Sequence, residues 1–275
     1  MRMGKKVIVF APHQDDEILS SSGTIDALKK YGAEIYIVFA TNGDFWGRKS
    51  AAIRLKESLS ALEQLQIKKE NIIVLGFADT GMDFHNSFLW RLYNSMDGKI
   101  IESPVSNVTY HPLNEFEYSM KRWHIHLPYT KDAFLKVLKD IIIRIDPDVV
   151  IASSRFDMHG DHAGLCMLVE QSINELKREI PIFEYIIHSG NDKTWPERET
   201  QTFNKPLNIS EELWRRRIIV PVENPLRKKR LIQLFASQIS SSGYLLSFAK
   251  KEEIFFIQRG STHNEKDYKN VMAQI

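Results

Sequence analysis

The chain of 275 residues is almost without cysteine. Its single thiol, Cys166, excludes an internal disulfide framework and a cysteine-rich zinc module, and is typical of a protein made for a reducing compartment. We therefore expect a cytoplasmic protein. An excess of one charge is also missing, because 37 Lys and Arg oppose 35 Asp and Glu. This balance excludes the strong overall field that attracts nucleic acid or anionic lipid.

Long apolar runs are missing as well. No stretch reaches the 18 apolar residues typical of a membrane-spanning helix. The apolar stretch after the basic N-terminus is interrupted by His13, Asp15 and Asp16 before the core of a signal peptide is complete. The composition, 43% hydrophobic and 26% charged, is otherwise that of an ordinary globular protein. At about 150 residues per domain, two small domains or one large one would fit, and we expect a single domain over residues 1–275.

Short apolar runs alternate with longer segments that carry apolar residues on one side. Strands are expected at 7–10, 34–40, 71–75, 149–152, 183–187 and 253–258. Helices are expected at 18–31, 50–65, 130–145, 161–178 and 224–239. This alternation is typical of an α/β fold, so we expect a Rossmann-like, mainly parallel sheet with helices on both faces.

Two segments lack this periodicity. Residues 78–128 are rich in aromatic side chains and histidines without a sustained period, which predicts a short helix near Phe88 followed by a long irregular insertion. Loops of this length inside compact domains are usually functional or mobile. Residues 191–205 are polar and are expected to form a second loop.

The densest cluster of titratable side chains lies where the first strand passes into the first helix. Its sequence is His13-Gln14-Asp15-Asp16-Glu17. A single capping residue would satisfy the helix N-terminus, and three adjacent carboxylates repel one another, so the surplus indicates a nearby cation. In open parallel sheets, ligands bind at this edge, outside the carboxyl ends of the strands.

A second cluster, Asp157-Met158-His159-Gly160-Asp161-His162, follows the strand at 149–152 in the same way. Together the clusters offer two imidazoles and one carboxylate, which with water is the composition of a catalytic zinc site. The same ligands define the facial triad of Fe(II) oxygenases. The spare carboxylates, one of which can serve as a general base, favour hydrolysis. The spacing alone leaves His159 and His162 interchangeable as ligands.

These residues resemble the motifs of a known family. The first cluster is similar to the His-Pro-Asp-Asp-Glu motif, and the end of the second to the His-Pro-Asp-His motif, of the PIG-L/LmbE-like zinc-dependent de-N-acetylases. Weaker similarities lie at 41–44, 54–57, 76–79, 237–238 and 253–255. The chain departs from the family at Gln14 and Gly160, where proline is common. Neither position supplies a ligand, so the departures concern loop rigidity.

The resemblance implies hydrolysis of the N-acetyl amide of an N-acetylglucosamine-type sugar or glycoconjugate. The implied metal ligands are His13, Asp16 and His162. Zinc is the expected metal, with Fe²⁺ or another divalent ion as the alternative. Asp15 would be the general base that later returns its proton to the leaving amine. His159 would stabilise the oxyanion, and Asp161 would hold the orientation and charge of His159.

Four further residues, in or after loops that follow strands, are expected to bind the substrate: Arg48, Arg54, Asp79 and His188. Solvated surface charges or internal ion pairs would explain them equally well. The alternative function is a sugar- or nucleotide-binding protein that retains the metal site without turnover. Asp15 and His159 together favour an enzyme, because a pure binder needs neither a base nor an oxyanion donor. The expected partner is a small N-acetylated sugar, not nucleic acid, and a homo-oligomer remains open.

Overall fold

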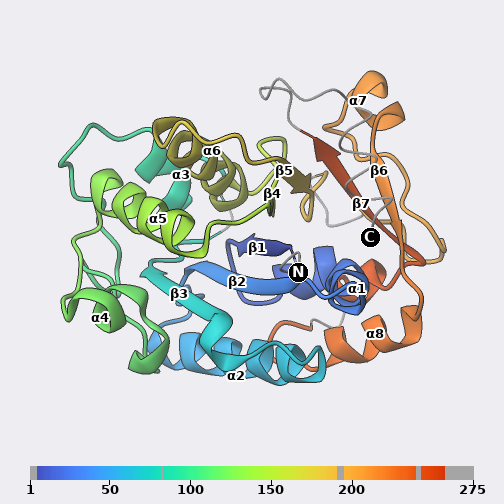
Figure 1. Cartoon of the computed structure of the whole chain (residues 1–275), viewed down its shortest axis with the longest axis horizontal. Coiled ribbons are helices and arrows are strands. Elements are labelled where there is room, and N and C mark those ends of the chain that lie inside the picture. Colours follow the sequence, from blue (N-terminus) through green and yellow to red (C-terminus); the bar gives the residue numbers. More distant parts are fainter. Residues whose placement is uncertain (1–4, 82, 191–194, 240–242, 258–275) are drawn as a thin grey trace.

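The computed structural model describes residues 5–81, 83–190, 195–239 and 243–257 and contains a seven-stranded sheet (Figure 1). The strands are β1 (Lys6–Ala11), β2 (Glu34–Thr41), β3 (Ile72–Phe77), β4 (Val149–Ser153), β5 (Ile182–Tyr185), β6 (Ile218–Pro221) and β7 (Glu252–Ile257). Their order in space is β3-β2-β1-β4-β5-β7-β6. The first five are parallel, and β7 runs antiparallel to both β5 and β6. The expected mainly parallel sheet is confirmed.

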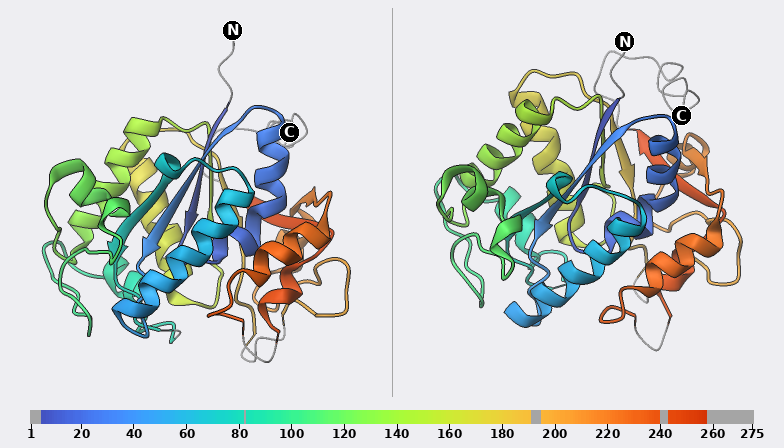
Figure 2. Two further views of the ribbon diagram at one scale, coloured as in Figure 1. Left: turned by 90° about the horizontal axis from the view of Figure 1, so that it is seen from below. Right: turned by 60° about the horizontal axis from the view of Figure 1, so that its bottom comes forward.

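Helices cover both faces of the sheet (Figures 1 and 2). One face carries α1 (Asp16–Lys30), α2 (Arg48–Gln64) and α8 (Pro225–Gln233); the other carries α3 (Phe88–Tyr93), α5 (Lys131–Ile145) and α6 (Gly160–Glu175). The short helices are α4 (Tyr118–Trp123), α7 (Glu211–Arg215), η1 (Lys69–Asn71), η2 (Asn114–Phe116) and η3 (Leu245–Phe248). No helix of the described residues has the length and apolar character needed to cross a membrane.

The strands are apolar throughout because the sheet has a core on each side. In β1, Val7 and Val9 pack into one core, whereas Ile8 and Phe10 pack into the other, and all four are fully buried. Successive side chains of a strand point to opposite faces, so a sheet covered twice needs apolar residues at every position. This explains why the continuous runs predicted the central strands well.

The insertion is better ordered than its sequence indicates. The short helix expected near Phe88 is present as α3, but α4 was not predicted, because six residues are too few to show helical periodicity. The buried carboxylate of Glu117 accepts hydrogen bonds from the hydroxyls of Thr109 and Ser119 and lies 3.0 Å from Nδ1 of His126. This polar cluster joins distant parts of the insertion.

The C-terminal region also differs from expectation. Strand β6 and helix α7 were not predicted, and α8 ends at Gln233 rather than 239. In β6 only alternate residues are buried, over four positions, which is too short for a clear pattern. Residue 258 of the expected last strand and residues 191–194 of the expected loop lie outside the described residues.

A buried carboxylate attaches this C-terminal region to the first helix. Glu253 of β7 accepts hydrogen bonds from the backbone N–H groups of Gly23 and Thr24 in α1, and from Nζ of Lys228 at 2.5 Å. Both Glu253 and Lys228 are buried. Because removing one partner would leave an uncompensated buried charge, the pair fixes β7 and α8 against α1, which carries part of the site.

Candidate metal and catalytic site

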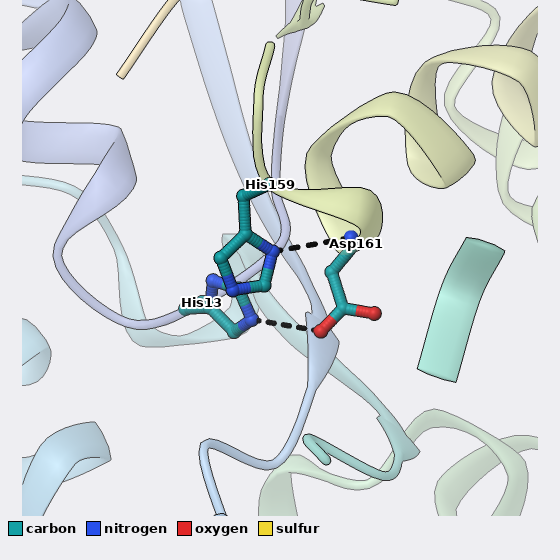
Figure 3. Close-up of side chains that lie close together, drawn as sticks. All are labelled: His13, His159 and Asp161. Atoms are coloured by element: carbon teal, nitrogen blue, oxygen red, sulfur yellow. Dashed lines mark hydrogen bonds and ion pairs between the residues drawn. The ribbon is translucent and has the colours of Figure 1, made fainter. Parts of the chain in front are cut away.

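The two motifs meet because β1 and β4 are parallel neighbours whose carboxyl ends lie at one edge of the sheet. His13 follows β1, and His159 and His162 stand at the start of α6 after β4. The ring centroid of His13 lies 4.9 Å from that of His159 and 5.4 Å from that of His162. Figure 3 shows His13 and His159 side by side, with Asp161 next to both. The expectation that the motifs form one cluster is therefore met.

Asp16 lies between the two imidazoles expected to bind metal. Its Oδ2 is 3.5 Å from Nδ1 of His13 and 3.3 Å from Nε2 of His162. All three side chains are buried. Carboxylate oxygens of Asp16 and Asp157 lie 3.3 Å and 3.2 Å from the two ring nitrogens of His162, but neither contact has the alignment of a hydrogen bond. Buried polar atoms without hydrogen bonds are rare, and two nitrogens with one carboxylate suit a divalent cation such as zinc.

Two other groups of side chains also approach closely enough to hold a metal: His13 with His159 and Asp161, and Asp157 with His162 and His188. The geometry favours the group centred on Asp16. Oδ2 of Asp161 is 3.2 Å from Nε2 of His13, and Oδ2 of Asp157 is 3.2 Å from Nδ1 of His162. Imidazoles that bind a metal usually present their second nitrogen to a carboxylate or carbonyl. In the group centred on Asp16, Asp161 and Asp157 occupy this orienting position behind His13 and His162.

The carboxylate of Asp161 is not where the resemblance implied. It pairs with His13 and accepts the backbone N–H of Leu89 in α3, and only the backbone N–H of Asp161 reaches His159, donating to Nδ1 at 3.1 Å (Figure 3). This follows from the start of α6, where His159 is the N-cap and accepts from the second helical residue. The carboxylate of Asp161 therefore serves His13 and not His159.

His159 is held as a neutral imidazole. Because Nδ1 accepts a hydrogen bond, the ring proton resides on Nε2. Burial holds the pKa of His159 well below its usual value, and the neighbouring His13, His188 and His162 act in the same direction. A neutral ring with a proton on Nε2 is a hydrogen-bond donor at neutral pH.

Asp15 has a strained backbone, with φ of 137°, a conformation that residues other than glycine rarely adopt. Its N–H donates to the buried carboxyl of Glu17, which also accepts from Ser58 at 2.8 Å. Nη2 of Arg54 lies 3.6 Å from Oδ1 of Asp15. Burial raises the pKa of Asp15 to about 7, even though Arg54 opposes the shift. A carboxyl poised near neutrality suits a general base.

A cavity of about 290 Å³ opens onto these groups. Three of the four expected substrate-binding residues line it, namely Arg54, Asp79 and His188. Arg54 contacts both Asp15 and Asp79, and Nδ1 of His188 lies 3.2 Å from Oδ1 of Asp157. Arg48 does not line the cavity; its guanidinium stacks over the ring of Tyr110 at 4.3 Å.

The two departures from the family motif have structural explanations. A Cβ on Gly160 would lie 2.0 Å from the carbonyl oxygen of Phe84, so neither alanine nor proline fits here without moving the insertion. The amide of Gln14 donates to the carbonyl of Thr41 at 2.9 Å and joins the loop after β1 to the end of β2. Packing against other segments thus fixes both loops.

Asp157 had no role assigned from the sequence. Its fully buried carboxylate accepts the backbone N–H groups of His159, Ile187 and His188, in addition to its contacts with the rings of His162 and His188. It therefore connects the loop after β4 with the loop after β5. Its place in the second motif, two residues before His159, was the feature of the sequence that could have indicated this role.

Comparison with known proteins identifies relatives of this fold. The family model described as GlcNAc-PI de-N-acetylase (PIG-L) matches residues 8–173. A deacetylase of the teicoplanin biosynthetic pathway, solved as a triple mutant, superposes with a TM-score of 0.57 at 13% identity, covering 94% of this chain and 100% of that one. The N,N'-diacetylchitobiose deacetylase of Pyrococcus horikoshii gives 0.55 at 19%, covering 92% and 84%. At these identities the likeness shows the fold.

Among curated proteins, a glucosamine-6-phosphate deaminase-like protein of Bacteroides thetaiotaomicron is 24% identical over 70 residues. The match covers 26% of this chain and 11% of that protein, so the chain spans about a tenth of the relative's length. The family model, by contrast, covers more than half of the chain and includes both motifs, 13–17 and 157–162. The chain therefore belongs to the GlcNAc-PI de-N-acetylase (PIG-L) family.

Proposed function

We propose that the protein is a metal-dependent hydrolase that removes the N-acetyl group from an N-acetylglucosamine-type sugar or glycoconjugate. The observation that carries the proposal is that His13, Asp15, Asp16 and the neutral imidazole of His159 line one cavity. His162 lies buried directly behind Asp16 and completes the group. Amide hydrolysis needs a site for the carbonyl, a base for water and a donor for the oxyanion, and this cluster offers all three.

His13, Asp16 and His162 would hold the metal, and zinc is our first choice, with Fe²⁺ or another divalent ion as the alternative. A divalent cation held there would lower the pKa of water and polarise the amide carbonyl. Asp157 and Asp161 keep both imidazoles turned toward Asp16.

Asp15 would take the proton from the attacking water and then hand it to the departing amine. Its strained backbone and its contacts with Glu17 and Arg54 fix the carboxyl at the cavity wall. The Nε2 proton of His159 would donate to the oxyanion of the tetrahedral intermediate, an interaction usually worth several kcal/mol.

Arg54, Asp79 and His188 would contact the sugar within the cavity. Arg48 lies outside the cavity, over the ring of Tyr110. We propose that Arg48 contacts only a part of the substrate that extends past Tyr110. That residues 1–275 form one domain and that the protein is cytoplasmic stay predictions, and a homo-oligomer stays open.

The alternative of a sugar- or nucleotide-binding protein without turnover is weaker. Backbone strain of the kind at Asp15 costs about 1–3 kcal/mol and persists where the surroundings enforce it, often at active sites. Binding of a sugar alone gives no reason to hold a strained carboxyl beside a neutral imidazole donor. Release of acetate from a panel of N-acetylated sugars separates the two functions.

The metal ligands are tested by elemental analysis of dialysed variants. We expect about one equivalent of divalent metal in the wild type and loss of most of it in His13→Ala, Asp16→Ala and His162→Ala. His159→Ala and His188→Ala serve as controls and should retain the metal, because these rings belong to the disfavoured groups. Full occupancy in Asp16→Ala, or loss in His188→Ala, would show that a different group binds the ion.

Replacing Asp157 tests how the ligands are oriented. We expect Asp157→Asn to weaken metal affinity by about 10- to 100-fold, the usual cost of removing a carboxylate behind a metal-binding histidine. Competition with a chelator measures the affinity. Asp44→Asn is the matched control, because Asp44 is also buried and accepts two hydrogen bonds but contacts no imidazole. Equal affinities in the two variants would contradict the role of Asp157.

Asp15→Asn should keep the metal and lower turnover by about 10²-fold or more. In the wild type, kcat/KM should rise as the pH increases through about 7, because the carboxylate is the active base. Arg54→Gln should move this midpoint upward, since the guanidinium lowers the pKa of Asp15. pH-rate profiles at fixed metal loading measure both effects. A downward shift in Arg54→Gln, or metal loss in Asp15→Asn, would refute the assignment.

His159→Ala should lower kcat and kcat/KM together by about 10²- to 10³-fold and leave KM nearly unchanged, because an oxyanion donor acts on the transition state. Asp161→Asn provides the contrast. Its carboxylate touches His13, so it should weaken metal binding and leave kcat at saturating metal close to that of the wild type. Steady-state kinetics with metal titration distinguish the variants. A loss of kcat in Asp161→Asn at saturating metal, as large as that of His159→Ala, would return Asp161 to His159.

A further inference from the structure

A tight turn between β2 and α2 carries two aromatic side chains at the margin of the cavity. The N–H of Gly47 donates to the carbonyl of Asp44 at 2.7 Å and closes the turn, which places Phe45 and Trp46 at its corner. Gly47 has φ of +91°, a conformation that favours glycine. The carboxylate of Asp44 accepts the hydroxyl of Tyr110 at 2.7 Å, so the base of the turn is anchored to the insertion.

Trp46 is 81% exposed although it lines the cavity. Phe45 supports it, because the two ring centroids are 4.6 Å apart with the ring planes at 66°. Phe45 in turn packs against Gly81, where an added Cβ would lie only 2.8 Å from Cε2 of the Phe45 ring. The indole is therefore presented to solvent from a fixed position.

The size of the cavity determines which part of a substrate can contact the indole of Trp46. About 290 Å³ is just below the range of about 300–1,000 Å³ for small-molecule pockets, which suits one sugar unit. The catalytic groups are buried, so the acetamido group must enter the deep part of the cavity. Any group attached to that sugar then lies outside, along the margin. The aliphatic side chains that line the cavity, Leu19, Ile187 and Leu245, are buried.

We propose that Trp46 is a specificity-determining residue that stacks on a flat apolar face of the group attached to the reacting N-acetylhexosamine. This inference rests on the proposed function and names its substrate class, an extended N-acetylglucosaminide rather than the free monosaccharide. A flat apolar face is offered by the C–H face of a second pyranose ring and by an aromatic aglycone. Either surface can stack on the exposed face of the Trp46 indole, which Phe45 supports by an edge-to-face contact.

The test compares three substrates: methyl N-acetylglucosaminide, N,N'-diacetylchitobiose and p-nitrophenyl N-acetylglucosaminide. Acetate release should show kcat/KM lowered by about 5- to 10-fold in Trp46→Ala on the last two, mainly through KM, and by less than about 2-fold on the first. Loss on chitobiose alone identifies the pyranose face, and loss on the aryl glycoside alone identifies the aromatic one. Trp46→Phe should restore most of the loss.

Tyr31→Ala is the control, because Tyr31 is 68% exposed at the end of α1 and does not line the cavity. It should match the wild type on all three substrates. Equal losses on all substrates in Trp46→Ala, or no loss on either extended one, would overturn the inference. Absence of acetate release by the wild type would overturn the proposed function instead. Calorimetric titration of the same compounds then decides the role of Trp46, since weaker binding of the extended compounds to Trp46→Ala supports it and equal binding refutes it.

Discussion

Buried negative charge is the constraint on which the site depends. Five carboxylates, each no more than 7% exposed, surround the histidines: Asp15, Asp16, Asp79, Asp157 and Asp161. Among the described residues that line the cavity, Arg54 is the only arginine or lysine. Unpaired buried charges are too costly to persist. Burial raises the pKa of Asp15 and of Asp161, which reduces the negative charge, and positive charge must balance the carboxylates that stay ionised.

The histidines can supply that charge in two ways. Burial opposes their protonation, but the carboxylates of Asp157 and Asp16 raise the pKa of His162 to about 10, and the pKa of His13 is also well above its usual value. Protons therefore occupy these rings when no cation does. A divalent ion would replace them, so binding releases protons and weakens as the pH falls. The same carboxylates that orient the rings thus tune the affinity of the site.

The sequence predicted the sheet, its parallel strands and the meeting of the two motifs, because these depend on period and chain order alone. It could not predict which way side chains point within a motif. Asp161 follows His159 by two residues, yet its carboxylate reaches His13, since the cap of α6 leaves only the backbone N–H for His159. Arg48 and Arg54 share helix α2, but Arg48 turns to Tyr110, whose position comes from the aperiodic insertion.

The insertion also explains how the chain works without the proline common in the second motif. Proline stiffens a loop locally by restricting φ. Here Gly160 lies so close to the carbonyl of Phe84 that the two segments constrain each other, and the N–H of Leu89 is bound by Asp161 one residue later. Residues 84–89 therefore contact the loop that carries His159 and, through Asp161, the ring of His13. Rigidity at the proposed metal ligands comes from packing between distant segments, which makes the insertion part of the site.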